Sequence, residues 1–373
     1  FNNAISYAEN GFPVSELVAY YLEGSANRFK NYPNFSNVWM KNGRTPDKGE
    51  IFTNKELATT YKKIASSYGQ DFYSGDIAKS IADFIQSQGG LLTIKDLANY
   101  EPEWIEPVSS NYRGYDIWEL PPNGQGIAAL QILNILENFN ISSMELDSAE
   151  YIHLFTEAKK LAYEDRAKYY ADMDFAKVPV KELLSDDYAN TRRKLIGEQA
   201  GTYAAGEISA GETIYMTVAD REGTMVSLIQ SNYRGMGSGM APPKLGFMLQ
   251  DRGELFSLKR GQANTYEPGK RPFHTIIPAF VTKDGKPFVS FGVMGGDFQP
   301  MGHTQIVMNL IDFGMNLQEA GDAPRWDHTG GASPSGRETR DTGLIRVESG
   351  IPYPTVRELL DRGHKIGIAR GVY

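Results

Sequence analysis

The spacing of apolar residues changes near residue 210, and this change constrains the fold more than any other feature of the chain. Before it, apolar residues mostly recur every three to four positions, which is the spacing of amphipathic helices. After it come short apolar runs separated by the turn signals DREG and KDGK, which is typical of antiparallel strands. The runs are TIYMTVA, TMVSLIQS, FHTIIPAFVT and PFVSFGV. The sequence therefore predicts an α+β fold.

The predicted strands are apolar on both faces, so both faces of their sheets need cover. Amphipathic helical patterns over residues 148–172, 303–314 and 355–364 can supply it, because they stand before and after the strand region. This predicts a layered arrangement of helix, sheet, sheet and helix. One further stretch, residues 326–343, is rich in Gly, Ser and charged residues, and it predicts a mobile surface loop.

Composition excludes several classes of function. The 373 residues carry a formal charge of -8, and no run of Lys and Arg interrupts this acidic background, so neither nucleic acid nor an anionic membrane is an expected partner. The longest apolar runs are too short to span a bilayer. No signal-peptide pattern is present in this chain, and a cytoplasmic location is therefore expected.

The chain has no cysteine, which excludes disulfides, thiolate nucleophiles and thiolate metal ligands. Any nucleophile must then be an oxygen or a nitrogen. His274 and His303 have no companion carboxylates at ligand spacing, so we predict no metal. GMGSG is followed by prolines where a dinucleotide-binding helix would begin, and no cofactor is expected.

The first two strand runs form a predicted hairpin whose open end carries hydroxyl groups. A three-residue turn over 221–223, with its glycine in the left-handed region, places Asp220 opposite Thr224. Counting back along the strands places Thr213 opposite Ser231. A two-residue turn would shift this pairing by one position.

Thr213 is a candidate nucleophile if its proton can be removed. A threonine's own α-amino group is a suitable base, because it titrates near pH 7.7 to 8. Thr213 is internal, so the bond between Glu212 and Thr213 would first have to be cut, and the Thr213 hydroxyl can attack that carbonyl itself. The alternative is an ordinary strand residue placed by its β-propensity.

Several longer motifs, in order along almost the whole chain, resemble those of γ-glutamyltranspeptidases, which are N-terminal nucleophile hydrolases. They are LTIKDLANYEP, NYRGYDIWELPPNGQG, EAKKLAYEDRAKYYAD, GETIYMTVADREGTMVSLIQSNYRGMGSG, PGKRPFHTIIPAFVTKDGKPFVSFGVMGGD and DAPRW. The resemblance implies a four-layer αββα sandwich and one precursor that cleaves itself into two subunits. The large-subunit part is 1–212 and the small-subunit part 213–373, and together they are expected to form one structural domain. Both ends are expected to be truncated relative to the family, and a homodimer is allowed.

The resemblance also assigns roles to four residues. Thr213 stands at the family's nucleophile, which forms an acyl-enzyme with a small-molecule amide substrate. Ser231 stands where the family has a threonine whose hydroxyl supports the nucleophile. Gly295 and Gly296 match the glycine pair whose N–H groups form the oxyanion hole, and the alternative for them is a plain turn at a strand end.

The chain departs from the family at the residues that bind the γ-glutamyl donor. Tyr233 replaces an Asn, Arg252 a Gln, and Leu255 the Asp that pairs with the donor's ammonium group. His274 and Thr275 replace a Ser pair that binds its carboxylate. Without that Asp the ammonium would stay unpaired, whereas an arginine suits a carboxylate. We therefore expect an acyl group with a terminal carboxylate and no amine.

The sequence thus predicts a self-processing amidohydrolase with altered donor specificity and water as acceptor. Gln299 and His303 are further candidates for substrate contacts. Two alternatives stay open. One is a true γ-glutamyl transferase or glutathione hydrolase, and the other is an unprocessed, non-catalytic homologue that binds a small acidic ligand.

Overall fold

The computed structural model describes residues 1–202, 212–338 and 341–369, which divide into two compact units. Unit 1 comprises Phe1–Trp104 and Arg234–Asp251. Unit 2 comprises Ile105–Tyr233 and the described residues from Arg252 onward. Each unit therefore contains residues from both sides of the expected cleavage site. That the two parts form one structural domain stays a prediction.

Unit 1 is mostly helical, as its apolar spacing predicts. Its elements are α1 Asn2–Asn10, β1 Phe12–Pro13, α2 Glu16–Phe29, α3 Phe35–Trp39, β2 Ile51–Phe52, α4 Lys55–Ser66, α5 Gln70–Ser74, α6 Asp76–Ser87 and α7 Ile94–Ala98. Two helix starts are set by side-chain caps: the Ser15 side chain accepts from the N–H of Val18, and Thr93 forms a reciprocal capping box with Asp96.

Unit 2 contains the predicted strands. Its elements are β3 Val108–Tyr112, β4 Tyr115–Glu119, α8 Gly126–Leu136, α9 Ala149–Tyr169, α10 Val180–Leu183, α11 Asp186–Arg193, β5 Glu212–Ala219, β6 Met225–Tyr233, β7 Ala279–Lys283, β8 Lys286–Phe291, α12 Gln299–Ile311, α13 Leu317–Asp322, β9 Trp326–Thr329, β10 Leu344–Val347, α14 Tyr353–Asp361 and β11 Lys365–Ile368, with short 3-10 turns at Ile141–Ser143, Arg252–Leu255 and Gly296–Phe298. The strands form an antiparallel sheet in the order β3-β4-β7-β8, the hairpin β5-β6, and a sheet in the order β11-β10-β9. This mixture of helices and sheets confirms the α+β prediction, although β10 and β11 pair in parallel.

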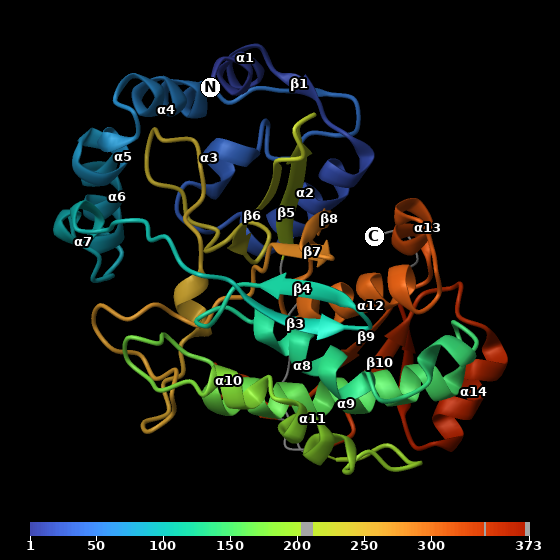
Figure 1. Ribbon diagram of the computed structural model, residues 1–373. Coiled ribbons are helices and arrows are strands. Elements are labelled where there is room, and N and C mark those ends of the chain that lie inside the picture. Colours follow the sequence, from blue (N-terminus) through green and yellow to red (C-terminus); the bar gives the residue numbers. More distant parts are fainter. Residues whose placement is uncertain (203–211, 339–340, 370–373) are drawn as a thin grey trace. The chain divides into compact units, whose positions relative to one another are not determined.

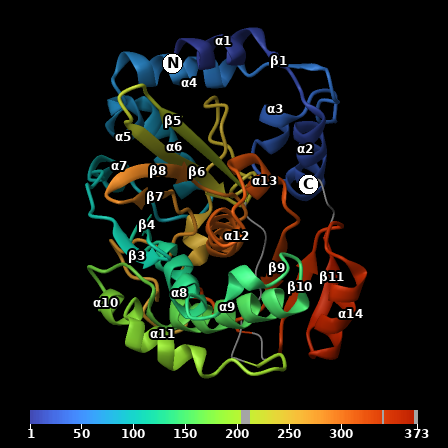
Figure 2. The same ribbon diagram turned by 45° about the vertical axis from the view of Figure 1, so that its right-hand side comes forward.

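The core of unit 2 lies between its sheets and its long helices. All residues of α8 are buried, and α8 packs against β3, β4, α9 and α12. Figures 1 and 2 both show α8 and α9 side by side next to the four-stranded sheet. Among the helices of the described residues, none combines the length and apolar character that crossing a bilayer requires.

The strand predicted over FHTIIPAFVT begins later than expected, at Ala279. The residues before it are irregular, because their backbone groups bond outside any sheet. The N–H of His274 donates to Asn123 O at 2.9 Å, and the N–H of Ile277 donates to the Gln299 side chain at 3.0 Å. Hydrogen-bond partners far along the chain therefore replace the expected strand pairing here.

The prediction of a mobile surface loop over residues 326–343 is wrong for its first part. Residues 326–329 form β9, and most described residues as far as 336 are buried or half-buried. The reason is a buried lysine: Lys159 Nζ donates to His328 Nδ1 at 3.1 Å, to His328 O at 3.1 Å and to Gly330 O at 2.9 Å. The polar groups that suggested a loop are thus paired inside the protein.

Candidate active site

The hairpin β5-β6 has the predicted turn and register. Gly223 has φ of 88°, and the N–H of Asp220 donates to Thr224 O at 3.0 Å, as in a three-residue turn with a bulge. Pairs run from Ala219 with Met225 to Ile214 with Gln230.

At the open end of the hairpin, a β-bulge then shifts the pairing. Glu212 pairs with Tyr233, so Thr213 alone lies opposite two residues, Ser231 and Asn232. Such a bulge redirects side chains at the end of a strand pair. Thr213 therefore lies opposite Ser231 and Asn232 together, at a local irregularity in the strand pairing, and the predicted regular pair of Thr213 with Ser231 is not formed.

The hairpin packs against the end of β8, next to the glycine pair. The Ser227 hydroxyl donates to Phe291 O at 3.4 Å. At Gly292 an added Cβ would lie 2.4 Å from the ring of Tyr215, so only glycine allows this close approach. This packing brings β5, which carries Thr213, to the segment that carries Gly295.

The side chain of Gln299 is a hydrogen-bond partner of Thr213. Its Nε2 lies 3.3 Å from Thr213 Oγ1, and its Oε1 accepts from the N–H of Ile277 at 3.0 Å. Gln299 is the first residue of α12 and is fully buried. The start of this helix therefore positions the hydroxyl group that the sequence singles out.

Gly295 and Gly296 form the turn between β8 and α12. Both have positive φ, 115° and 58°, which favours glycine. A Cβ at Gly295 would lie 3.2 Å from the Cβ of Phe298. Since the first N–H groups of a helix have no partner within the helix, this turn is suited to binding an anionic oxygen.

A buried network underlies the glycine turn. Gln125 Nε2 donates to Thr275 O at 2.7 Å and to Gly296 O at 2.8 Å. Arg166 Nη1 donates to Gln125 Oε1 at 2.6 Å and to Asp297 Oδ1 at 2.7 Å. The network therefore holds the backbone at Thr275 and at the turn that contains Gly296 and Asp297.

Sequence reasoning missed this network. Gln125 and Asp297 stand inside the motifs PPNGQG and VMGGD, and Arg166 stands on the amphipathic helix, but no spacing connects them. The only available signal was chemical: an Arg within a helix that is otherwise buried needs a buried anion. Tyr163, on the same helix, also donates to the Asp297 carbonyl oxygen.

The predicted substrate-binding residues lie together. Arg252 is 4% exposed, and its Nη1 donates to Thr275 Oγ1 at 2.6 Å. Its guanidinium carbon lies 5.3 Å from the centre of the Tyr233 ring, a cation–π distance. Burial, together with the charge of Arg252, lowers the pKa of His274 to about 3. His274 is therefore neutral at ordinary pH, and Arg252 supplies the positive charge.

Ser231 and Tyr233 are fixed by a local bond at the bulge. The Ser231 hydroxyl accepts from the N–H of Tyr233 at 2.8 Å. Tyr233 has φ of 76°, uncommon for a residue with a side chain, and is buried. The strand end that faces Thr213 therefore has a defined shape.

His303 is not placed for substrate contact. It is 1% exposed, and its Nδ1 lies 2.6 Å from Glu119 Oε1. Burial raises the pKa of Glu119, while His303 acts in the opposite direction. The His303 ring also packs on the Phe291 ring, with centroids 4.8 Å apart. The interpretation of His303 as a substrate contact is therefore replaced by a structural role in the core.

Within the described residues, one group could offer three metal ligands: His153, Glu157 and His364, whose ligand atoms lie within 4.8 Å of one another. His153 Nδ1 already lies 2.8 Å from His364 Nε2. The two carboxylate oxygens of Glu157 accept from Lys160 Nζ at 2.6 Å and from the N–H of Gly201 at 3.0 Å. Lys160 thus supplies the cation beside Glu157, and the absence of a metal stays a prediction.

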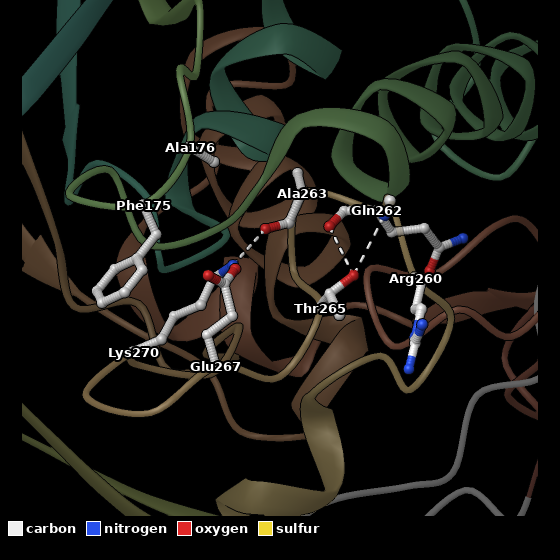
Figure 3. A pocket seen from close by; sticks show the side chains of 9 residues that line it. Phe175, Ala176, Arg260, Gln262, Ala263, Thr265, Glu267 and Lys270 are labelled. Atoms are coloured by element: carbon white, nitrogen blue, oxygen red, sulfur yellow. Dashed lines mark hydrogen bonds and ion pairs between the residues drawn. The ribbon is translucent and has the colours of Figure 1, made fainter.

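Two cavities of unit 2 differ in their relation to the candidate active site. One, of 460 Å³, borders Gly295 and Asp297. The other, of 330 Å³, lies around the loop 260–270 and is shown in Figure 3. In that second cavity the Lys270 ammonium donates to Ala263 O at 2.8 Å and to Glu267 at 2.9 Å, so its charge is already paired. Of these two cavities, the first alone has a predicted catalytic residue, Gly295, in its lining.

Comparison with known proteins gives a consistent result. The family described as "Gamma-glutamyltranspeptidase" matches residues 1–372. The chain is 38% identical to the "Glutathione hydrolase-like YwrD proenzyme" of Bacillus subtilis (strain 168), covering 98% of this chain and 68% of the relative. It is 34% identical to the "Acylase ACY 1 proenzyme" of Pseudomonas sp. (strain SE83), covering 97% of this chain and 64% of the relative.

Among solved structures, the cephalosporin acylase from Bacillus halodurans is similar, with a TM-score of 0.88 and 43% identity. The match covers 98% of this chain and 66% of that one. This chain therefore spans about two thirds of the length of the proteins it matches.

Proposed function

The chain belongs to the γ-glutamyltranspeptidase family, and on that premise we propose that it is a self-processing amidohydrolase with Thr213 as nucleophile. The observation that carries the proposal is the 3.3 Å contact between Thr213 Oγ1 and Gln299, the first residue of the helix that follows the glycine pair. Nucleophile and oxyanion donors would then be positioned by the same helix start. The names of the relatives, hydrolase and acylase proenzymes, support self-processing and hydrolysis.

In the processing step, the Thr213 hydroxyl attacks the carbonyl carbon of Glu212. The peptide C–N bond breaks, the Oγ proton passes to the departing nitrogen, and an ester joins Glu212 to Thr213 Oγ. Water hydrolyses this ester, leaving a carboxylate on Glu212 and a free α-amino group on Thr213. The products are a large subunit ending at residue 212 and a small subunit beginning at residue 213, which stay associated.

In turnover, the free amine of Thr213 takes the Oγ proton while Oγ attacks the substrate amide carbonyl. The N–H groups of Gly295 and Gly296 then donate to the oxyanion, and such donors contribute about 3 kcal/mol each to lowering the barrier. The amine returns the proton to the leaving nitrogen, and water hydrolyses the acyl-enzyme. Ser231, opposite Thr213 at the bulge, supports the hydroxyl.

We further propose that the acyl group carries a terminal carboxylate and no amine, as a glutaryl group does. Arg252 provides a buried cation beside Thr275. His274 is neutral at ordinary pH because its pKa is lowered to about 3, so it adds no second positive charge. Leu255, which is buried, offers no counter-charge to an ammonium group. The names of the relatives include both a glutathione hydrolase-like protein and acylases, so this part of the proposal depends on Arg252 and Leu255.

The arrangement of layers belongs to the same proposal. We infer the αββα sandwich of N-terminal nucleophile hydrolases, with the helix pair α8 and α9 as one outer layer. The packing of α8 against β3 and β4, and of α9 against α8, supports this assignment.

The test compares glutaryl, succinyl and γ-glutamyl anilides as substrates of the purified full-length protein. The proposal expects hydrolysis of the glutaryl or succinyl anilide to be at least tenfold faster than that of the γ-glutamyl anilide. Faster turnover of the γ-glutamyl anilide would favour the true transferase. No turnover of any anilide, together with an uncleaved chain, would favour the non-catalytic binder.

A further inference from the structure

The amide of Gln299 connects two groups whose chemistry fixes its orientation. A backbone N–H can only donate, so the group that accepts from Ile277 at 3.0 Å must be the amide oxygen, Oε1. The amide nitrogen then faces Thr213 Oγ1 at 3.3 Å. Gln299 is therefore the donor in this contact, and the Thr213 hydroxyl is the acceptor.

The position of Gln299 is rigid for reasons independent of Thr213. It is fully buried, and it directly follows the turn Gly296–Phe298 at the start of α12. That turn is held by buried side chains, since Gln125 donates to Gly296 O and Arg166 donates to the Asp297 carboxylate. The glutamine amide therefore cannot leave Thr213 without breaking the bond to Ile277.

We propose that Gln299 is a hydrogen-bond donor to the nucleophile, which orients the Thr213 hydroxyl in self-cleavage and in turnover. A hydroxyl that accepts from an amide keeps its own proton free to move to a base. The bond strengthens as negative charge develops on Oγ, which happens when Oγ attacks and again when it leaves the acyl-enzyme. At 3.3 Å the resting bond is long, so it can shorten as that charge appears.

This inference rests on the proposed function, since it assigns a role within the same site. It also replaces the expectation that Gln299 contacts substrate. A residue that only supported the fold would affect stability, whereas a donor to Oγ affects the rate of two chemical steps.

The test measures self-cleavage of newly synthesised full-length protein in a cell-free system, followed on SDS gels at pH 8 and pH 5. Two variants remove the donor. Gln299→Met removes both polar atoms, while Gln299→Glu keeps an oxygen for Ile277 and loses the N–H. Gln305→Met is the matched control, because Gln305 is also a buried glutamine of α12, with its amide bonded to Trp326 O at 2.9 Å.

We expect Gln299→Met to self-cleave about 10 to 100 times more slowly than wild type at both pH values. Gln299→Glu should be equally slow at pH 8 and should recover at least threefold relative to wild type at pH 5, because its protonated carboxyl can donate to Oγ. Gln305→Met should cleave within about twofold of wild type. In the fraction of each Gln299 variant that does mature, kcat should fall while KM stays unchanged.

Three results would overturn the inference, and one of them also overturns the proposed function. If wild type cleaves before Thr213 and both Gln299 variants match Gln305→Met, the donor role is wrong and the proposed function stands. If wild type never cleaves there, the donor role and the proposed function both fail. Should Gln299→Met fail to fold, a Gln299→Glu variant without recovery at pH 5 would also contradict the donor role.

Discussion

Arg166 and Asp297 form a buried ion pair, with Nη1 of the arginine 2.7 Å from Oδ1 of the aspartate. The Arg166 side chain is 1% exposed and the Asp297 side chain 7%, so solvent screens neither charge strongly. Asp297 follows the glycine pair directly, and Arg166 also binds Gln125. The pair thus connects α9 to the turn that would provide the oxyanion hole.

Removing one partner of this pair should be costly. Arg166→Met would leave Asp297 buried and unpaired, and we expect a loss of about 3 to 5 kcal/mol in the free energy of unfolding. Urea unfolding in a Thr213→Ala background, where we expect an uncut chain, measures it. Arg325→Met is the control, because Arg325 pairs with Glu348 while 56% exposed, and it should cost at most about 1 kcal/mol. Equal losses in both variants would contradict this account.

Gly295→Ala should impair catalysis. At φ of 115° a Cβ is strained, and it would crowd Phe298 at 3.2 Å, so the turn must shift. We expect kcat of the cleaved protein to fall about 100- to 1,000-fold, the loss typical of one oxyanion donor. Gly321→Ala, where a Cβ would meet nothing within 4 Å, should leave steady-state kinetics unchanged. A normal kcat in Gly295→Ala would show that this turn has no role in the mechanism.

Arg252→Gln should change donor preference rather than general activity. We expect KM for an acyl donor with a terminal carboxylate to rise about 10- to 100-fold, as expected for loss of a charge-assisted hydrogen bond. KM for a neutral acyl donor of the same length should stay within twofold. Measuring both donors in parallel separates lost recognition from general damage. If both KM values rise together, Arg252 does not read the carboxylate.

The buried histidines should make the fold sensitive to acid. Burial, with the nearby charges of Lys160 and Arg362 and the neighbouring His153, lowers the pKa of His364 to about 3. The unfolded chain has an ordinary histidine pKa near 6.5. Between pH 6.5 and pH 3, His364 is therefore protonated in the unfolded chain and neutral in the folded protein. Stability is therefore fully present above pH 6.5 and is lost as the pH falls from about 6.5 toward 3.

The matched variant for this effect is His364→Gln. Between pH 6 and pH 4 it should lose less stability than wild type, by up to about 1.4 kcal/mol per pH unit, the value for one proton. Urea unfolding at several pH values in the Thr213→Ala background measures the difference. Parallel curves for the two proteins would show that His364 does not titrate on unfolding.

Local features of the fold could be predicted from sequence because neighbouring residues determine them. The hairpin register follows from the turn around Gly223, and the helix starts at Ser15 and Thr93 follow from their own side chains. The clustering of Arg252 with Thr275 was anticipated only through family resemblance.

The rest depends on contacts that no local pattern encodes. Arg166 and Asp297 are 131 positions apart, and Gln299 and Thr213 are 86 apart. The segment around His328 looked like a loop because its polar partner, Lys159, comes from a helix 169 positions earlier. Buried polar networks of this kind become visible only when the chain is folded.

The central claim is that the chain is cut before Thr213 and that Thr213, once it is N-terminal, is the nucleophile. N-terminal sequencing of the smaller fragment of mature, active full-length protein tests it most directly. We predict the sequence Thr-Ile-Tyr-Met-Thr, and a single uncut chain in Thr213→Ala. An active amidohydrolase whose peptide bond between Glu212 and Thr213 is intact would contradict the account.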